Sequence, residues 1–438
     1  MRRLLILATT TGYQTREFAE AARRAGAEPV LATDQCHRLD DPWGDGAITV
    51  RFHNTARYAG LLEANGPFDG IVAVGDRPAF LAAMAAERLR IPFHPPAAVE
   101  ACRSKYLSRE RFRAAGLNVP SYFRVPLAAD PLEAARRAPF PCVLKPLGLS
   151  GSRGVIRADN EPDFVAAFER IKKLLTSLEI RMRRDEQDRF IQVEEFIPGR
   201  EFALEGLVTD GALRTLALFD KPDPLDGPLF EETIYVTPSR ETEAAQREIV
   251  ATAGRAVAAL GLTHGPVHAE LRWNERGAWM LEAAPRPIGG LCARALRFSG
   301  GVSLEELILR HALGEDVARY RLDGQASGVM MIPIPRAGIY EDVAGLERAR
   351  AVEGIEDVVV SAERGQKLEP LPEGSSYLGF IFARGPTAAE VEAALRSAHA
   401  LLEFKIATAL PVVSSSPAEA RTPPATPRPR RRSTPPSA

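Results

Sequence analysis

The sequence predicts an α/β protein that changes to an α+β organisation further along the chain. The chain has 438 residues, more than one ordinary hydrophobic core accommodates, so two to four domains or subdomains are expected. Short apolar runs alternate with amphipathic stretches over the first hundred residues, as in βαβ units with a parallel sheet. From Ser121 to about Phe298, antiparallel-type strand patterns mix with helical ones, which is typical of α+β structure.

The first unit is expected to alternate strands with helices. The strand patterns cover residues 4–8, 29–32 and 70–74, and the helical patterns cover residues 15–25 and 77–88. The loops at residues 9–12 and at Gly75-Asp76 follow strands, where open α/β sheets usually bind ligands. Neither loop has the GxGxxG fingerprint, so the interpretation as plain turns stays open.

Breaks in the pattern divide the rest of the chain. A helical segment at residues 97–115 ends at Gly116, and a new unit begins near this point. A third, smaller unit opens with a strand at residues 326–332 and closes with a strand at 376–383 and a helix at 387–402. Beyond Pro411 the chain is rich in Pro, Ser, Thr and Arg, so this tail is expected to be disordered. Its basic cluster offers a contact to nucleic acid or membrane, but a solvated tail is the favoured interpretation.

Composition narrows the possible classes of function. The chain is 45% hydrophobic and 26% charged with a net charge of -1, which excludes a disordered body and an overall basic field for nucleic acid or anionic lipid. No apolar stretch approaches the roughly 20 residues of a membrane span, and the apolar run at residues 4–8 is short for an export signal. The four cysteines are scattered, which disfavours structural zinc and a disulfide framework. A cytoplasmic protein is expected.

The strongest local feature is a lysine at the end of an apolar strand, followed by a loop of glycine and serine. The lysine is Lys145, and the loop contains Gly148, Ser150, Gly151, Ser152 and Gly154. Such a loop can direct several backbone N–H groups at phosphate oxygens, and serine hydroxyls and a lysine add donors. It lacks the GxxxxGK[ST] order of a P-loop, and an ordinary hairpin turn is the alternative.

Lysine usage supports a phosphate site, because arginine greatly outnumbers lysine in this chain. Lys105 stands at the start of the helix before the second unit, where a cation does not help the helix but can hold a phosphate. A solvated lysine is the alternative there.

Two further clusters carry glutamates. Glu194 and Glu195 end one strand, and Glu201 follows a Pro-Gly turn, so these side chains can meet an adenine amino group and ribose hydroxyls or belong to a charged hairpin. Glu270 and Glu282 lie on two strands of a second hairpin, where they can face each other. Opposed carboxylates repel unless a cation lies between them, which predicts a hard ion such as Mg²⁺.

Residues after the second hairpin complete the predicted site. Arg286 can stabilise negative charge on a transferring phosphoryl group. Gly289, Gly290 and Arg294 form a flexible, cationic lip suited to a carboxylate substrate. The segment at residues 220–230 and the Gly–Ser loop are candidate lids.

Taken in order, these four elements resemble the ATP-grasp superfamily. Within it, residues 268–271 and 282–290 are similar to carboxylate–amine ligases, especially the L-amino acid α-ligases that form dipeptides. Residues 328–338 and 370–380 resemble the C-terminal domain of those ligases. The resemblance implies an N-terminal parallel-sheet domain at 1–102, a two-subdomain ATP-grasp unit at 103–322, a small α+β ligase domain at 323–408 and a tail at 409–438.

The resemblance also implies roles for individual residues. Lys105 and Lys145 would hold ATP phosphates under the Gly–Ser loop, and Glu201 would bind the ribose. The adenine contacts would come from Glu194 and from the backbone of Glu195 and Ile197. Glu270 and Glu282 would bind Mg²⁺ or Mn²⁺, Arg286 would stabilise the acyl phosphate, and His268 would line the substrate site. Many ATP-grasp enzymes have Asn as a third metal ligand at the position of Ala284. Dipeptide ligases have Ala at this position, as this chain does. The number of metal ions therefore stays open.

The activity that the resemblance implies is ADP-forming ligation of a small carboxylate, such as an amino acid, to an amine. Nucleic acid and membrane are not expected as partners, and a homodimer is possible. Two alternatives remain. One is a carboxylase of the same superfamily that activates bicarbonate, and the other is a non-catalytic, ATP-binding regulatory protein.

Overall fold

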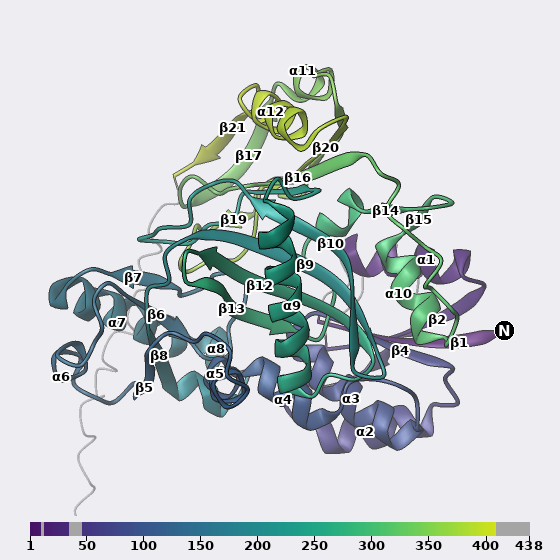
Figure 1. Cartoon of the computed structure of the whole chain (residues 1–438), viewed down its shortest axis with the longest axis horizontal. Coiled ribbons are helices and arrows are strands. Elements are labelled where there is room, and N and C mark those ends of the chain that lie inside the picture. The colour runs from purple at the N-terminus through teal and green to yellow at the C-terminus, as the bar shows by residue number, and fades with distance from the viewer. Residues whose placement is uncertain (10–12, 35–45, 409–438) are drawn as a thin grey trace, which may run out of the picture.

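The computed structural model describes residues 1–9, 13–34 and 46–408 (Figure 1). Its strands form sheets of four, eight, two, three and four strands, which confirms the mixed α/β and α+β prediction. The predicted tail and most of the predicted loop at residues 9–12 lie outside the described residues. None of the helices in the described ranges has the length and hydropathy needed to cross a membrane.

The N-terminal sheet is parallel, as predicted, with the strand order β3-β2-β1-β4. Its strands are β1 (Arg2–Ala8), β2 (Ala27–Thr33), β3 (Ile48–Thr49) and β4 (Gly70–Val74), and the helices of this unit are α1 (Tyr13–Arg24), α2 (Thr55–Ala64), α3 (Asp76–Leu89) and α4 (Pro96–Arg103). Leu4 and Ile6 pack into one core, whereas Leu5 and Leu7 pack into another with residues of α2 and α3. Both faces of β1 are therefore covered, which explains its uninterrupted apolar run.

The helical segment predicted at residues 97–115 consists of two helices. Helix α4 ends at Arg103, and α5 (Lys105–Ala114) begins after Ser104, whose side chain accepts a hydrogen bond from the backbone N–H of Leu107 at 3.4 Å. Serine is a favoured helix N-cap, so it starts a new helix in a new direction. This break places Lys105 at a helix N-terminus, as the sequence predicts.

A four-stranded antiparallel sheet with the order β5-β8-β6-β7 follows. Its elements are β5 (Tyr122–Pro126), α6 (Pro131–Ala135), β6 (Cys142–Pro146), β7 (Ile156–Ala158), α7 (Glu161–Leu175), α8 (Leu178–Arg181), η2 (Glu186–Arg189) and β8 (Phe190–Glu195). Phe164, Phe168 and Ile171 of α7 pack in one core with Leu144 of β6 and Val193 of β8. Helix α7 thus holds the strand that carries Lys145.

The largest sheet has eight strands in the order β13-β12-β9-β10-β11-β16-β20-β18. Its strands are β9 (Arg200–Thr209), β10 (Ala212–Lys221), β11 (Ile234–Thr237), β12 (Gly265–Asn274), β13 (Gly277–Ala284), β16 (Ala326–Ile332), β18 (Ile355–Val360) and β20 (Gly379–Gly385). Helix α9 (Glu243–Leu260) lies across β9, β12 and β13 (Figure 1) and shares a core with Phe202, Leu204 and Leu271. This face of the sheet is closed by the helix, so polar side chains of these strands point to the opposite face.

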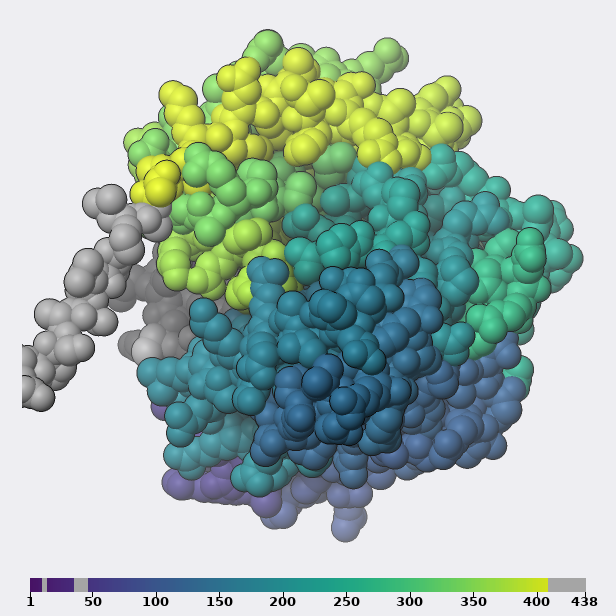
Figure 2. Space-filling model, turned by 90° about the vertical axis from the view of Figure 1, so that its left-hand side faces the viewer, coloured from purple at the N-terminus to yellow at the C-terminus, as the bar shows by residue number. Residues whose placement is uncertain are grey.

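The C-terminal region continues this sheet. Strand β16 pairs with β11 and β20, so the hydrogen-bonded sheet runs across the predicted boundary at residues 322 and 323. The remaining elements are η3 (Cys292–Ala295), β14 (Arg297–Phe298), β15 (Val302–Ser303), α10 (Leu304–Ala312), β17 (Gly338–Ala344), α11 (Leu346–Arg350), β19 (Lys367–Leu368), α12 (Ala388–His399) and β21 (Glu403–Ala407). In Figure 2 the C-terminal region, coloured green to yellow, rests directly against the teal and blue region. The predicted domain bounds stay a prediction.

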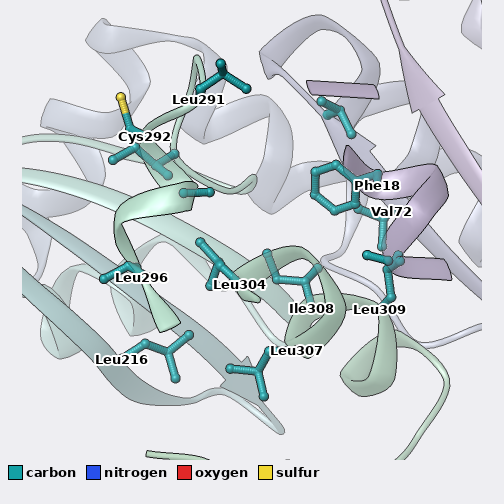
Figure 3. Packing of buried hydrophobic residues seen from close by; sticks show 14 of the residues in the cluster. Phe18, Val72, Leu216, Leu291, Cys292, Leu296, Leu304, Leu307, Ile308 and Leu309 are labelled. Carbon is teal, nitrogen blue, oxygen red and sulfur yellow. The ribbon is translucent and has the colours of Figure 1, made fainter. Parts of the chain in front are cut away.

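One hydrophobic core joins the predicted domains. Phe18 and Val72 of the N-terminal unit lie beside Ile308 and Leu309 of α10 (Figure 3). Phe380 of β20 belongs to the same core. A Cβ on Gly70 would lie 2.8 Å from the backbone oxygen of Ala312, so β4 and the end of α10 approach closely only because this residue is glycine.

Three buried or half-buried histidines lie where the N-terminal unit meets the large sheet. His94 contacts the backbone oxygen of Pro266 at 3.2 Å, and the rings of His264 and His311 stack with centroids 4.1 Å apart. Burial lowers the pKa of His94 and that of His311 from 6.5 to about 4. The unfolded chain therefore binds more protons than the folded chain between these values, so stability is complete above about pH 6.5 and falls as the pH drops toward 4.

The variant His94→Gln tests this dependence, because glutamine does not titrate. Between about pH 7 and about pH 5, we expect urea denaturation to show a loss of unfolding free energy that is roughly 2 kcal/mol smaller in the variant than in the wild type. The comparison of the two proteins cancels the contribution of groups that they share. Equal losses of unfolding free energy in both proteins would contradict the lowered pKa of His94.

Candidate active site

A pocket lies between the antiparallel sheet β5-β8-β6-β7 and the eight-stranded sheet. Its polar and charged lining residues are Lys105, Lys145, Ser150, Ser152, Glu194, Glu195, Glu201, Glu232, His268, Glu270, Arg272, Glu282 and Arg286, and Gly151 and Ile197 line it as well. Most of the residues selected from the sequence thus meet in one place. Gly148 lines a smaller pocket that shares Lys105, Ser150 and Glu282 with the first.

Strand pairing explains why these side chains share one face. Glu205 lies opposite His268 in the pairing of β9 with β12, and Glu270 lies opposite Glu282 in the pairing of β12 with β13. Because side chains alternate between the two faces of a strand, the residues between them, such as Leu204 and Ala269, point under α9. The predicted juxtaposition of Glu270 and Glu282 is confirmed.

Lys145 is held by a buried carboxylate. Its Nζ donates to Glu194 at 2.6 Å, and Glu194 also accepts hydrogen bonds from Gln192 at 2.6 Å and from Arg109 at 3.2 Å. Burial raises the pKa of Glu194, but Arg109 and Lys145 outweigh this effect and hold it well below its usual range. The oxygens of Glu194 thus already accept hydrogen bonds from three side chains, and its predicted contact with adenine stays a prediction.

Sequence reasoning missed Arg109, which is only 1% exposed. It also donates to the backbone oxygen of Leu281 at 3.0 Å, so it joins α5 to β13 and β8. No local pattern distinguishes a buried arginine on a helix from a solvated one.

The Gly–Ser loop has the backbone shape expected of a phosphate cradle. Gly151, Ser152 and Gly154 have φ values of 63°, 54° and 74°, and a Cβ on Gly154 would lie 2.6 Å from Pro146. Lys105 Nζ donates to the backbone oxygen of Leu149 at 2.7 Å, so it lies directly under the loop. This conformation turns backbone N–H groups in a way that suits an anion.

The C-terminal region fastens the loop from the other side, a contact that the sequence did not reveal. The N–H of Gly154 donates to the backbone oxygen of Pro372 at 2.8 Å, and Arg153 Nε donates to that of Glu373 at 2.7 Å. The side chain of Glu373 also pairs with Arg170 at 2.6 Å. Residues 372 and 373 therefore hold the Gly–Ser loop that lines the pocket.

Three carboxylates that line the pocket surround a buried lysine. One oxygen from each of Glu201, Glu232 and Glu270 lies within 4.8 Å of the others, a set that can hold a metal ion. Lys221 Nζ is 2.9 Å from Glu201 and 3.6 Å from Glu270, and it also pairs with Glu232. Burial would lower the pKa of Lys221, but the three carboxylates raise it well above its usual value.

Each of the two opposed glutamates has a lysine nearby. Glu270 has Lys221 as its nearby cation, and Glu282 has Lys105 at 3.6 Å. The predicted metal ligands Glu270 and Glu282 stay a prediction, and Glu232 adds a third carboxylate. Lys221 was missed, although the scarcity of lysine that drew attention to Lys145 applies equally to it.

His268 and Arg286 also line the pocket, and His268 lies next to Glu270. His268 Nδ1 pairs with Glu205, and its Nε2 is 3.4 Å from Glu270. Burial lowers the pKa of His268, but the two glutamates outweigh burial and raise it to about 9. Arg286 pairs with Asp76 at 2.9 Å, so the strand-end loop at Gly75-Asp76 does reach the site.

The predicted lip residues Gly289, Gly290 and Arg294 are not among the residues that line the pocket. Arg294 pairs with Asp357 at 3.5 Å and lies over the ring of Phe382, so it is directed to the C-terminal part of the sheet. A Cβ on Gly290 would lie 2.9 Å from Phe380, whereas Gly289 has open space around it. Packing against Phe380 therefore accounts for Gly290, and the structure does not bring Arg294 to the other site residues.

The variant Lys221→Met should remove the one cation that Glu201, Glu232 and Glu270 share. We expect the free energy of unfolding to fall by about 3 kcal/mol or more, because an uncompensated buried charge is costly. Millimolar MnCl₂ should restore part of this loss in urea denaturation by binding the carboxylates. The exposed Lys367→Met is the control, and equal losses in both variants, or no effect of Mn²⁺, would argue against the charge balance described above.

Comparison with known families matches two parts of the chain. Residues 138–295 match the ATP-grasp domain, and residues 330–407 match the L-amino acid ligase C-terminal domain 2. The alanine–anticapsin ligase of Bacillus amyloliquefaciens is 29% identical over 240 residues, which are 52% of this chain and 50% of that ligase. The chain thus aligns with about half the length of that relative.

Solved structures agree with these matches. The L-amino acid ligase from Bacillus licheniformis has a TM-score of 0.80 and 27% identity, covering 93% of this chain and 99% of that one. N5-carboxyaminoimidazole ribonucleotide synthetase from Thermotoga maritima has a TM-score of 0.68 at 16% identity, covering 93% and 100%, and so shares the fold. The resemblance noted in the sequence is confirmed, since this chain has the ATP-grasp fold and contains an ATP-grasp domain followed by an L-amino acid ligase C-terminal domain.

Proposed function

We propose that this protein is an ATP-dependent, ADP-forming ligase that joins a small carboxylate, such as an amino acid, to an amine through an acyl phosphate. The observation that carries the proposal is the pairing of Glu270 with Glu282 on the same sheet face as Lys221, with Arg286 beside them and two further lysines opposite. Similarity to alanine–anticapsin ligase and to an L-amino acid ligase supports an amine as the acceptor.

ATP would lie between the two sheets. Lys105 and Lys145 would neutralise its phosphates under the Gly–Ser loop, the backbone at Glu195 and Ile197 would meet the adenine, and Glu201 would meet the ribose. The pocket has apolar walls at Phe196 and Phe230, which suit a base. Arg272 donates to Glu201 at 2.9 Å and so orients the carboxylate for the ribose.

Carboxylates are the ligands that Mg²⁺ and Mn²⁺ prefer, so the residues present fit such an ion. Glu270 and Glu282 would hold it, with Glu232 near Glu270 as a further carboxylate. The ion, when bound, neutralises charge on the β- and γ-phosphates.

Two displacements follow. A substrate carboxylate oxygen attacks the γ-phosphorus, and ADP leaves, giving an acyl phosphate. The amine then attacks the acyl carbon, loses a proton and displaces inorganic phosphate. Arg286, held by Asp76, would stabilise the negative charge in both steps, and His268 would line the substrate side. The loop and residues 372–373 would exclude water, which would otherwise hydrolyse the acyl phosphate.

The direct test measures ADP with Mg²⁺ and pooled amino acids, followed by mass spectrometry of the products. ADP release that needs both an acid and an amine, with a new amide product, supports ligation. Release that depends on bicarbonate would instead support a carboxylase, and absence of release would support a regulatory ATP-binding protein. Location in the cytoplasm and a homodimer stay predictions.

The variants Glu282→Ala and Arg286→Ala should each lower the rate of ADP formation by at least about 100-fold, because each removes a charge that acts on the reacting phosphate. Circular dichroism and thermal melting should show that both variants remain folded. Glu243→Ala and Arg247→Ala, an exposed pair on α9, are the matched controls and should keep wild-type turnover. Unchanged turnover in Glu282→Ala or Arg286→Ala would refute the role proposed for that residue.

A further inference from the structure

Glu205 is a buried carboxylate to which neither the sequence nor the proposed reaction gives a role. It is 1% exposed and lies on β9, on the sheet face that forms the pocket. A buried carboxylate is costly unless its oxygens are hydrogen-bonded. One of its oxygens contacts His268 Nδ1, and the other accepts a hydrogen bond from the backbone N–H of Ile288 at 3.3 Å.

The contact of Glu205 with His268 connects it to Glu270, the predicted metal ligand. Glu205 and His268 are direct neighbours in the pairing of β9 with β12, so the strand register fixes this contact. With Nδ1 held by Glu205, the imidazole presents Nε2 to Glu270 at 3.4 Å. One nitrogen of the ring is thus anchored in the sheet, and the other faces the carboxylate that would hold the ion.

The contact of Glu205 with the backbone of Ile288 connects it to the segment that carries Arg286, the predicted catalytic arginine. Ile288 follows Arg286 by two residues, and its N–H is fixed by the second oxygen of Glu205. The backbone oxygen of Ile288 in turn accepts a hydrogen bond from Gln14 at 3.1 Å. Arg286 itself is held by Asp76 at 2.9 Å. The segment that carries the arginine is therefore tied to the same carboxylate as the histidine.

We propose that Glu205 is a positioning residue that orients His268 against Glu270 and anchors the segment carrying Arg286, so that metal ligand and arginine keep one mutual arrangement. The proposal rests on the proposed function. Partners of metal ligands typically change metal affinity or activity by about 10–100-fold when they are removed. A side chain that only stabilises the fold would not change metal affinity in this way.

Glu205→Gln tests the proposal with little change of volume. The carboxylate offers two acceptor oxygens, whereas the amide offers one acceptor and one donor, so the variant cannot accept from both His268 and Ile288. We expect kcat and Mn²⁺ affinity in the presence of ADP to fall by about 10–100-fold, while the KM for ATP changes much less. Glu305→Gln, a buried glutamate on α10 away from the pocket, is the matched control and should stay near wild type in each quantity.

Mn²⁺ affinity is measured by the electron paramagnetic resonance signal of the free ion, which needs no turnover. If Glu205 acts through His268, the double variant Glu205→Gln/His268→Gln should bind Mn²⁺ no more weakly than His268→Gln alone. Losses that add, or a Glu205→Gln variant with Mn²⁺ affinity and kcat close to those of the control, would overturn the proposal.

The two readouts separate this proposal from the proposed function. A wild type that binds Mn²⁺ and ADP but forms no amide product would refute the ligase, and the Mn²⁺ comparison would still decide the role of Glu205. If Glu205→Gln does not fold, His268→Gln provides the measurement, and Mn²⁺ affinity equal to wild type in that variant would overturn the proposal.

Discussion

The site depends on one constraint, the register in which β10, β9, β12 and β13 pair. This register places Lys221 beside Glu201, Glu205 beside His268, and Glu270 beside Glu282. A shift by one residue would turn every one of these side chains toward α9 and bring Phe202 or Leu204 into the pocket. The apolar contacts under α9 prevent that shift, so the same alternation that fills the core also collects the charges on the opposite face.

Charge balance is the second requirement. Carboxylates around the pocket lie beside cations, as Glu201 lies beside Lys221 and the half-buried Asp76 beside Arg286. Such pairs contribute little net stability, because desolvation offsets much of their attraction. Their value lies in geometry, since fixed charges need no reorganisation when a reacting group acquires negative charge.

The candidate site is assembled from parts of the chain that lie far apart in the sequence. Asp76 comes from the N-terminal unit, Glu270 from the large sheet, and the C-terminal segment reaches the Gly–Ser loop through Pro372 and Glu373. The core that joins α1, α10 and β20 fixes how these parts meet, as Figure 3 shows for Phe18 and Leu309. Opening of the pocket must therefore separate contacts that lie far apart in the sequence.

The sequence by itself determined the parallel N-terminal sheet, the two hairpins and the likeness to ATP-grasp ligases, because alternation, turn residues and short motifs are local properties. It also placed Glu270 opposite Glu282, since both belong to one hairpin. Only the tertiary structure revealed Arg109, Lys221, Glu205 and Glu373 as parts of the site, and directed Arg294 elsewhere. Each of these side chains acts through a partner distant in sequence, and the physical reason for their placement is strand pairing and core packing, which no local pattern records.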